Sequence, residues 1–146
     1  MMNLNKSGTC YLSKEEKPLI IAIDFDGTCV THDYPDMGHD IGAEPVLRKI
    51  VKSNHDLILY TMRSGKELQD AIKWFEERKI PLWAVNDNPS QHTWTSSPKV
   101  CAHLYIDDAA MGAPLIYQGH GRPYINWVEV ERLLTINGQL PADQKA

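Results

Sequence analysis

The sequence lacks the features that mark several large classes of protein. No apolar run approaches the length that spans a membrane, so we expect no membrane domain. The three cysteines are scattered without a CxxC pair, so neither a zinc site nor a disulfide framework is expected. The net charge of −4 argues against binding along an extended nucleic acid. The polar first residues carry no secretion signal, which predicts a cytoplasmic location.

The composition is that of an ordinary globular domain. Of the 146 residues, 42% are hydrophobic and 23% are charged, which is enough to build one sizeable core. We find no internal repeat and no low-complexity tract. We therefore expect a polar lead-in over residues 1–17, a single domain over 18–136 and a loose tail over 137–146.

Strand and helix patterns alternate along the chain. Apolar runs that are typical of buried strands occur at residues 19–23, 57–60, 82–85 and 100–106. Apolar residues at helical spacing occur at about 44–53, 66–79 and 127–136. Such alternation predicts βαβ units and a mainly parallel sheet. The expected fold class is α/β, a Rossmann-like three-layer sandwich around that sheet.

The first apolar run leads directly into Asp24-Phe25-Asp26-Gly27-Thr28, the most informative segment of the chain. A buried strand that ends in two acids places negative charge at the carboxyl edge of a sheet, where open α/β folds bind ligands. Desolvated carboxylates repel each other, so a cation or a proton must compensate them. The segment therefore indicates chemistry that involves Mg²⁺ and phosphate.

Further polar residues follow the other predicted strands. Thr61 comes after the second strand, and Asp107 and Asp108 come after the last. In a parallel sheet these ends share one edge, so the side chains should converge there. The acid pair suits an oxygen-ligated Mg²⁺. Thr61 offers a hydroxyl to a phosphoryl oxygen, and Lys99 offers positive charge.

Together these residues resemble the four motifs of the haloacid dehalogenase-like superfamily of phosphotransferases. The resemblance covers roughly residues 18–115 and keeps the order of the motifs, which are Asp24-Phe25-Asp26-Gly27-Thr28, Thr61, Lys99 and Asp107-Asp108. It implies that Asp24 is the nucleophile and Asp26 the general acid and base. It also implies that Mg²⁺ is held by the Asp24 carboxylate, the Asp26 backbone carbonyl and Asp107, with Asp108 in support.

One spacing departs from the pattern of that superfamily. Lys99 precedes Asp107 by only eight positions, which is closer than the third motif normally lies. Lys66, Lys73 and Lys79 are the alternatives, but all three fall on the predicted second helix. Lys99 therefore remains the favoured catalytic lysine.

The sequence leaves no room for a separate cap domain over the site. Only residues 29–43 separate the first motif from the first predicted helix. We name residues 29–42 the flap and expect it to lie near the leaving group. An open site should accept a large substrate, or a neighbouring subunit of a homo-oligomer should cover it. Thr28, Met62 and Arg63 are the candidate substrate-binding residues.

The predicted function is a magnesium-dependent phosphatase that hydrolyses a phosphate monoester through an aspartyl-phosphate. Its substrate would be a phosphorylated small molecule or a phosphoprotein. Two alternatives stay open. One is a receiver-like signalling domain that accepts a phosphoryl group on Asp, although such domains carry the acid pair first and the acceptor later. The other is a catalytically silent binding protein with the same fold.

Overall fold

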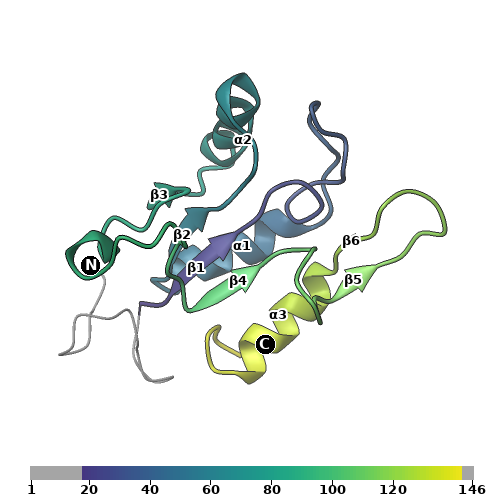
Figure 1. Ribbon diagram of the computed structural model, residues 1–146. Helices are drawn as coiled ribbons and strands as arrows, with labels where there is room; N and C mark the ends of the chain where they lie inside the picture. Colours follow the sequence, from purple (N-terminus) through teal and green to yellow (C-terminus); the bar gives the residue numbers. More distant parts are fainter. Residues whose placement is uncertain (1–17, 143–146) are drawn as a thin grey trace.

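A parallel four-stranded sheet forms the centre of the computed structural model, which describes residues 18–142 (Figure 1). Its strands are β1 (Ile20–Ile23), β2 (Asp56–Leu59), β3 (Ala84–Val85) and β4 (Leu104–Ile106), in the spatial order β3-β2-β1-β4. The helices are α1 (Ala43–Lys52), α2 (Gly65–Glu77) and α3 (Trp127–Ile136), together with the short 3₁₀ helix η1 (Gln91–Thr93). A separate antiparallel hairpin joins β5 (Leu115–Ile116) to β6 (Tyr124–Ile125). The predicted α/β Rossmann-like fold around a mainly parallel sheet is confirmed, but the layer on the second face is the connection over residues 86–103 and not a long helix.

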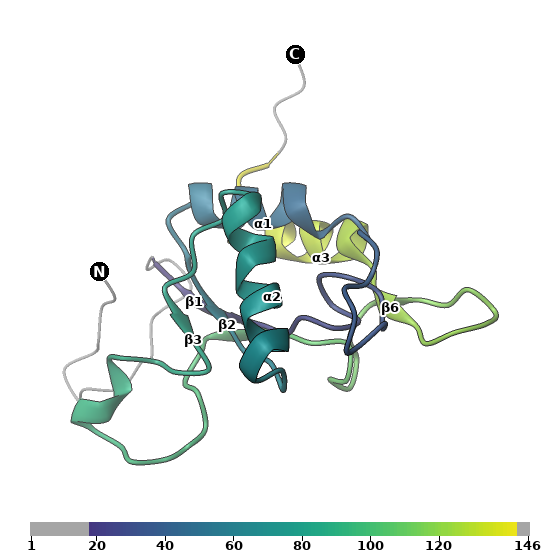
Figure 2. The ribbon, with the colours of Figure 1, turned by 90° about the horizontal axis from the view of Figure 1, so that it is seen from above.

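All three long helices pack on the same face of the sheet. Alternate residues of β1 and β2 form one hydrophobic core with the apolar sides of α1, α2 and α3. Seen from above, the three helices lie together on that side (Figure 2). The helices form there because each places apolar side chains at helical spacing, such as Val46, Leu47 and Ile50 of α1. This face holds most of the buried side chains.

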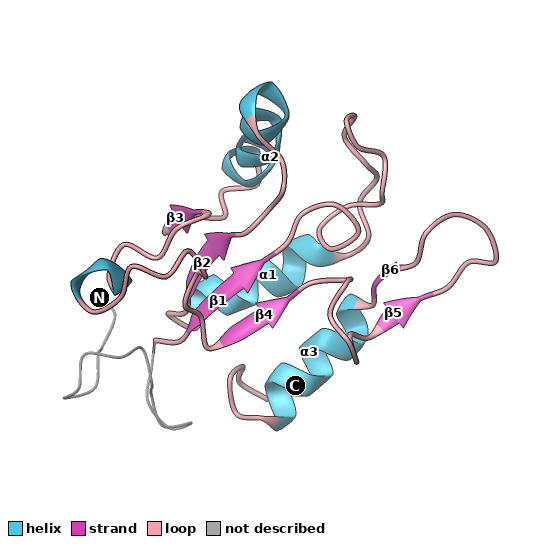
Figure 3. Cartoon of the chain, in the orientation of Figure 1, coloured by secondary structure: helices cyan, strands magenta, loops and turns pink. Residues whose placement is uncertain are grey.

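The opposite face of the sheet is covered without a long helix. The connection from β3 to β4, residues 86–103, crosses this face and contains only η1, as Figure 3 shows. It packs Val100 against Ile20 and Ile58, which point away from the three helices. The return crossover runs from one sheet edge to the other, so the right-handed rule places it on the face opposite α1 and α2.

The last predicted strand is shorter than its apolar run. The sequence predicts a strand over 100–106, but β4 begins at Leu104. The buried side chain of Gln91 accepts a hydrogen bond from the Cys101 amide and donates to the Lys99 carbonyl. Buried Asn88 donates to the Cys101 carbonyl. These side chains occupy the backbone groups that a longer strand would need for sheet pairing.

Packing continues past the end of α3. Leu140 is buried in the main core, and its amide donates to the Leu134 carbonyl. The expectation that the chain is loose from residue 137 was therefore wrong at Leu140. The predicted lead-in over 1–17 and the last residues, 143–146, lie outside the described part of the chain.

Two further expectations concern the cysteines and the membrane. Cys29 is buried and free, whereas Cys101 is disulfide-bonded, although the spacing of the cysteines did not predict a disulfide framework. Cys10 lies outside the described residues. Within residues 18–142, each helix is too short or too polar to cross a membrane.

A buried hydrogen bond fixes α3 to the turn that carries the predicted catalytic acids. The indole Nε1 of Trp127 donates to the Thr28 carbonyl at 2.7 Å, and Trp127 is 3% exposed. Because Trp127 is the first residue of α3, this bond connects residues far apart in the chain. If the Thr28 carbonyl lost this hydrogen-bond donor, it would stay buried without a partner, and the free-energy cost of its desolvation would no longer be offset.

We therefore expect Trp127→Phe to lower the free energy of unfolding by about 1–3 kcal/mol, measured by urea denaturation. Trp94→Phe is the matched control, because Trp94 is 38% exposed and should change stability by less than about 0.5 kcal/mol. Equal losses in the two variants would contradict a special role for the Trp127 bond.

Candidate active site

The site is built on the turn that follows β1. The Asp24 amide still donates to the Ile106 carbonyl, so Asp24 continues the sheet ladder. The amides of Thr28 and Cys29 then donate to the Phe25 carbonyl, which closes the turn. The Phe25 ring is fully buried against Trp74 and Phe75 of α2. Burial of Phe25 anchors the turn and fixes the directions of the acids on either side of it.

Three predicted carboxylates meet at the carboxyl edge of the sheet. Asp24, Asp107 and Asp108 each offer one oxygen, and these oxygens all lie within 4.8 Å of one another. The three side chains come from the ends of the neighbouring strands β1 and β4. This is the convergence expected from parallel strands that end at one edge.

Thr28 connects two of these acids. Its hydroxyl lies 2.9 Å from an Asp24 oxygen and donates to it, and the same hydroxyl oxygen accepts from the Asp108 amide at 3.1 Å. Thr28 is completely buried. It therefore positions Asp24 and Asp108, and the expectation that it touches substrate was wrong.

The environment of Asp24 disfavours its negative charge. Burial, then hydrogen bonding with the Asp108 carboxyl, then the charge of Asp107 raise the pKa of Asp24 to about 8, although the Thr28 hydroxyl partly opposes them. None of these influences comes from a neighbouring cation. The buried carboxyl of Asp24 therefore keeps its proton to a higher pH than an exposed aspartate does.

The flap reaches this cluster through His32. The His32 Nε2 atom lies 2.9 Å from an Asp108 oxygen, and both side chains are largely buried. A side chain at Gly27 has no room here, because its Cβ would lie 1.9 Å from His32 Nε2. Gly27 also has φ of +80°, a conformation that favours glycine. Glycine at this position therefore allows the flap to close on the acids.

Asp26 points away from the three acids and pairs with Arg63. Its two oxygens accept from Arg63 Nη2 at 2.7 Å and from Nε at 2.8 Å, a bidentate pair. Arg63 also donates to the carbonyls of Asp36 and Glu67. Only 1% of the Arg63 side chain is exposed, so the guanidinium is held by protein oxygens. The expectation that Arg63 binds substrate was wrong for this arrangement.

The remaining predicted residues lie at the same edge without joining the cluster. Thr61 follows β2; its amide donates to the Asn86 side chain and its hydroxyl accepts from the Arg63 amide. Met62 is 97% exposed. The Lys99 ammonium lies 5.7 Å from the centre of the Tyr105 ring, and within residues 18–142 it forms no ion pair with Asp24. In this conformation Lys99 thus contacts Tyr105 and not the acids.

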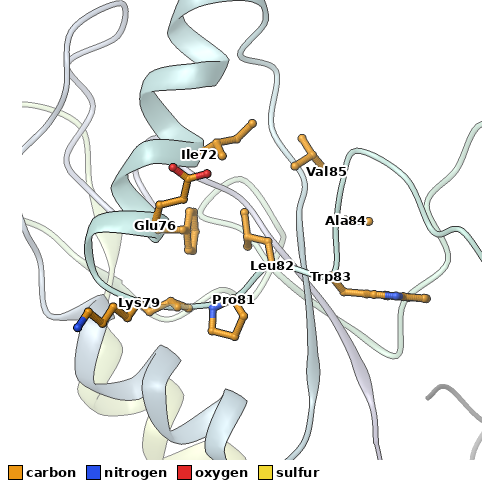
Figure 4. Close-up of a pocket in the computed structure, with 10 residues that line it drawn as sticks. Ile72, Glu76, Lys79, Pro81, Leu82, Trp83, Ala84 and Val85 are labelled. Atoms are coloured by element: carbon orange, nitrogen blue, oxygen red, sulfur yellow. The ribbon is translucent and has the colours of Figure 1, made fainter.

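The cavities of the described chain differ in their relation to the acids. A cavity of about 580 Å³ lies between α2 and β3 at the sheet edge, with Ile72 and Val85 at one end and Lys79 and Pro81 at the other (Figure 4). None of the cluster acids lines it. A smaller cavity of about 280 Å³ between β4 and α3 includes Asp107 in its wall.

Sequence reasoning missed the roles of His32 and Arg63. Neither residue lies in a spacing that indicates contact with an acid, and only the path of the flap brings His32 to Asp108. The signal that could have found Arg63 is its place two residues after Thr61, at the same strand end as the acids. An arginine near paired acids at one sheet edge is a candidate for an ion pair.

Comparison with known proteins found similarity between this chain and a solved structure. No family model matches the chain, and no curated protein matches it. A conserved protein from Bacteroides thetaiotaomicron is 34% identical; the match covers 82% of this chain and 92% of that one, with a TM-score of 0.67. Identity at this level over most of both chains shows common descent as well as a shared fold. The chain belongs to the same family as this conserved Bacteroides protein.

Proposed function

We propose that this protein is a magnesium-dependent phosphatase of the haloacid dehalogenase-like superfamily, which hydrolyses a phosphate monoester through an aspartyl-phosphate on Asp24. One observation carries the proposal. Asp24, Asp107 and Asp108 offer oxygens within 4.8 Å of one another at the carboxyl edge of the sheet. Three such acids are costly to hold together, and phosphoryl transfer is a chemistry that uses them.

The residues present fit a magnesium ion. The ligands offered by Asp24, Asp107 and Asp108 are all carboxylate oxygens, the type that Mg²⁺ prefers. Burial, followed by the Asp108 hydrogen bond and the Asp107 charge, raises the pKa of Asp24 to about 8, and a bound cation would favour its charged form instead. When bound, the ion would offset the charge of these acids and of the phosphoryl oxygens.

The chain's own groups account for the two chemical steps. An Asp24 oxygen attacks phosphorus, the bond to the leaving oxygen breaks, and the leaving oxygen takes a proton from Asp26. Water then gives a proton to Asp26 and attacks the phosphorus, which releases inorganic phosphate and restores the Asp24 carboxylate. Thr28 keeps Asp24 in place during both steps through its 2.9 Å hydrogen bond.

The ion pair with Arg63 controls when Asp26 can act as an acid. Both Asp26 oxygens are occupied by the guanidinium, so Asp26 must leave Arg63 before it can reach a leaving group. The Arg63 guanidinium also binds the Asp36 carbonyl of the flap. Movement of the flap and release of Asp26 should therefore occur together.

We expect Asp24→Asn to reduce hydrolysis of an aryl phosphate with Mg²⁺ by roughly 10⁴-fold or more, because the nucleophile is lost. Steady-state release of inorganic phosphate measures this effect. Asp70→Asn is the matched control, since Asp70 lies on α2, outside the acidic cluster, and its ion pair is with exposed Lys66. Stoichiometric phosphorylation of the wild-type protein without turnover would indicate a receiver domain instead.

We expect the stability of the metal-free protein to fall as the pH rises from about 4 to about 8. The pKa of Asp24 is raised in the folded state from 3.8 to about 8, so the stability gained from its bound proton is lost across this window. Denaturation in chelator at several pH values measures the slope. Added Mg²⁺ should restore stability at pH 8, and Asp24→Asn should flatten the slope. A slope that is the same in Asp24→Asn would contradict the assignment to Asp24.

We expect Asp26→Asn to slow hydrolysis by about 10²- to 10⁴-fold for esters with poor leaving groups and by much less for esters with good ones. The dependence of kcat on the leaving-group pKa measures this difference. Arg63→Gln is the comparison variant, because it removes the ion pair but keeps the acid. An equal loss for every leaving group in Asp26→Asn would exclude proton donation by Asp26.

A further inference from the structure

Two half-exposed tyrosines lie beside the acidic cluster on the face of the sheet that lacks long helices. Tyr60 follows β2 and is 37% exposed, and Tyr105 lies in β4 and is 39% exposed. Their ring centres are 6.3 Å apart. The nearby connection over residues 86–103 covers only part of this face, since both rings remain open to solvent.

The alternation of side chains along each strand places these rings on the same face as the acids. Ile23, Leu59 and Ile106 point into the core beneath the helices, so the residue after each points the other way. Tyr60 therefore lies level with Asp24, because its amide donates to the Ile23 carbonyl. Tyr105 lies two residues before Asp107 on the same face.

The small side chain of Ala22 allows the rings to meet across β1. Ala22 pairs with Ile58 of β2 and Tyr105 of β4, so it lies between the strands that bear the tyrosines. A methyl group leaves the space above β1 to the two aromatic rings. A larger residue at position 22 would separate them.

Tyr105 is held in a fixed orientation, and a cation lies next to it. Its hydroxyl donates to the Val100 carbonyl at 2.6 Å and accepts from the Ala102 amide at 3.2 Å. The Lys99 ammonium lies 5.7 Å from the centre of the Tyr105 ring. The Tyr105 ring is thus held rigidly, with the Lys99 ammonium over it, two residues before Asp107.

Exposed aromatic faces of this kind bind flat rings by stacking. On a strand, Tyr105 and Asp107 are separated by about 6.6 Å, at about 3.3 Å per residue. A ring bonded directly to the ester oxygen would lie too close to the acids to stack on Tyr105. A ring held one sugar away from the phosphate suits this separation.

We propose that Tyr60 and Tyr105 form a stacking site for the base of a nucleoside 5′-monophosphate, with the phosphate at Asp24. This inference rests on the proposed function, because it names the substrate class of that same site. The Lys99 ammonium lies over the Tyr105 ring and adds positive charge that favours an anionic ligand.

The test compares adenosine 5′-monophosphate with ribose 5-phosphate, which have the same ester linkage but differ in the base. In the wild-type protein with Mg²⁺ we expect kcat/KM for the nucleotide to be about tenfold higher or more, the range expected for stacking on an aromatic side chain. Tyr60→Leu should remove this preference through KM and leave ribose 5-phosphate unchanged. Tyr60→Phe, which keeps an aromatic ring, should retain the preference for the nucleotide. Tyr117→Leu, at a tyrosine that is 75% exposed next to β5, is the control.

A binding measurement separates this inference from the proposed function. Calorimetry with Asp24→Asn and Mg²⁺ should show tighter binding of the nucleotide than of ribose 5-phosphate, and Tyr60→Leu should abolish the difference even if the protein hydrolyses neither compound. Equal binding of the two compounds, or equal losses for both in Tyr60→Leu, would overturn the stacking site. If Tyr60→Leu weakens phenyl phosphate alone, the site takes a directly attached aryl ring and the nucleotide assignment is wrong.

Discussion

Repulsion among three carboxylates is the constraint around which the rest of this protein is arranged. Asp24, Asp107 and Asp108 come from two adjacent strand ends, and their positions follow from the register that pairs β1 with β4. Nothing about the acids themselves favours this proximity. It is maintained because β1 behind them is fully buried and because Trp127 and Thr28 fix the turn from the other side. The energy of the core thus holds together groups that would otherwise separate.

The sequence predicts the acids of the candidate site well because their placement depends on the sheet alone. Strand ends can be recognised from apolar runs, and parallel strands bring their ends to one edge, so the order of residues is enough to place Asp24 and Asp107 together. The partners of these acids could not be predicted in this way. His32 reaches Asp108 only through the path of the flap, and Arg63 reaches Asp26 and the flap's Asp36 carbonyl through the loop between β2 and α2. The path of a loop depends on many weak contacts, and these produce no periodic pattern of apolar residues in the sequence.

The limits of β4 and the position of Lys99 show a related difficulty. The apolar run over 100–106 has strand character throughout, yet buried Asn88 and Gln91 hold its first half in another conformation. Lys99 directly precedes that segment, so its side chain follows the loop and contacts Tyr105 instead of the acids. Polar residues that are buried in a loop are not distinguishable from exposed ones by composition, so this segment could not have been placed from the sequence.

The one-sided arrangement of helices gives the two faces of the sheet different properties. The face beneath α1, α2 and α3 contains most of the hydrophobic core and supplies stability. The other face has a smaller core around Ile20, Ile58 and Val100, and near the acids it ends in exposed aromatic rings. Burial of apolar area is thus concentrated where no ligand needs to enter. The lightly covered face is left for recognition.

The four hydrogen bonds of the Arg63 guanidinium connect the flap, the start of α2 and Asp26 through a single side chain. An insertion or deletion in the flap would shift the Asp36 carbonyl and, through Arg63, the carboxyl of Asp26 as well. The length of the flap and the position of the proton donor Asp26 are consequently coupled through Arg63. A variant with a remodelled flap would need a compensating change at position 63 before it could accept a new substrate at full rate.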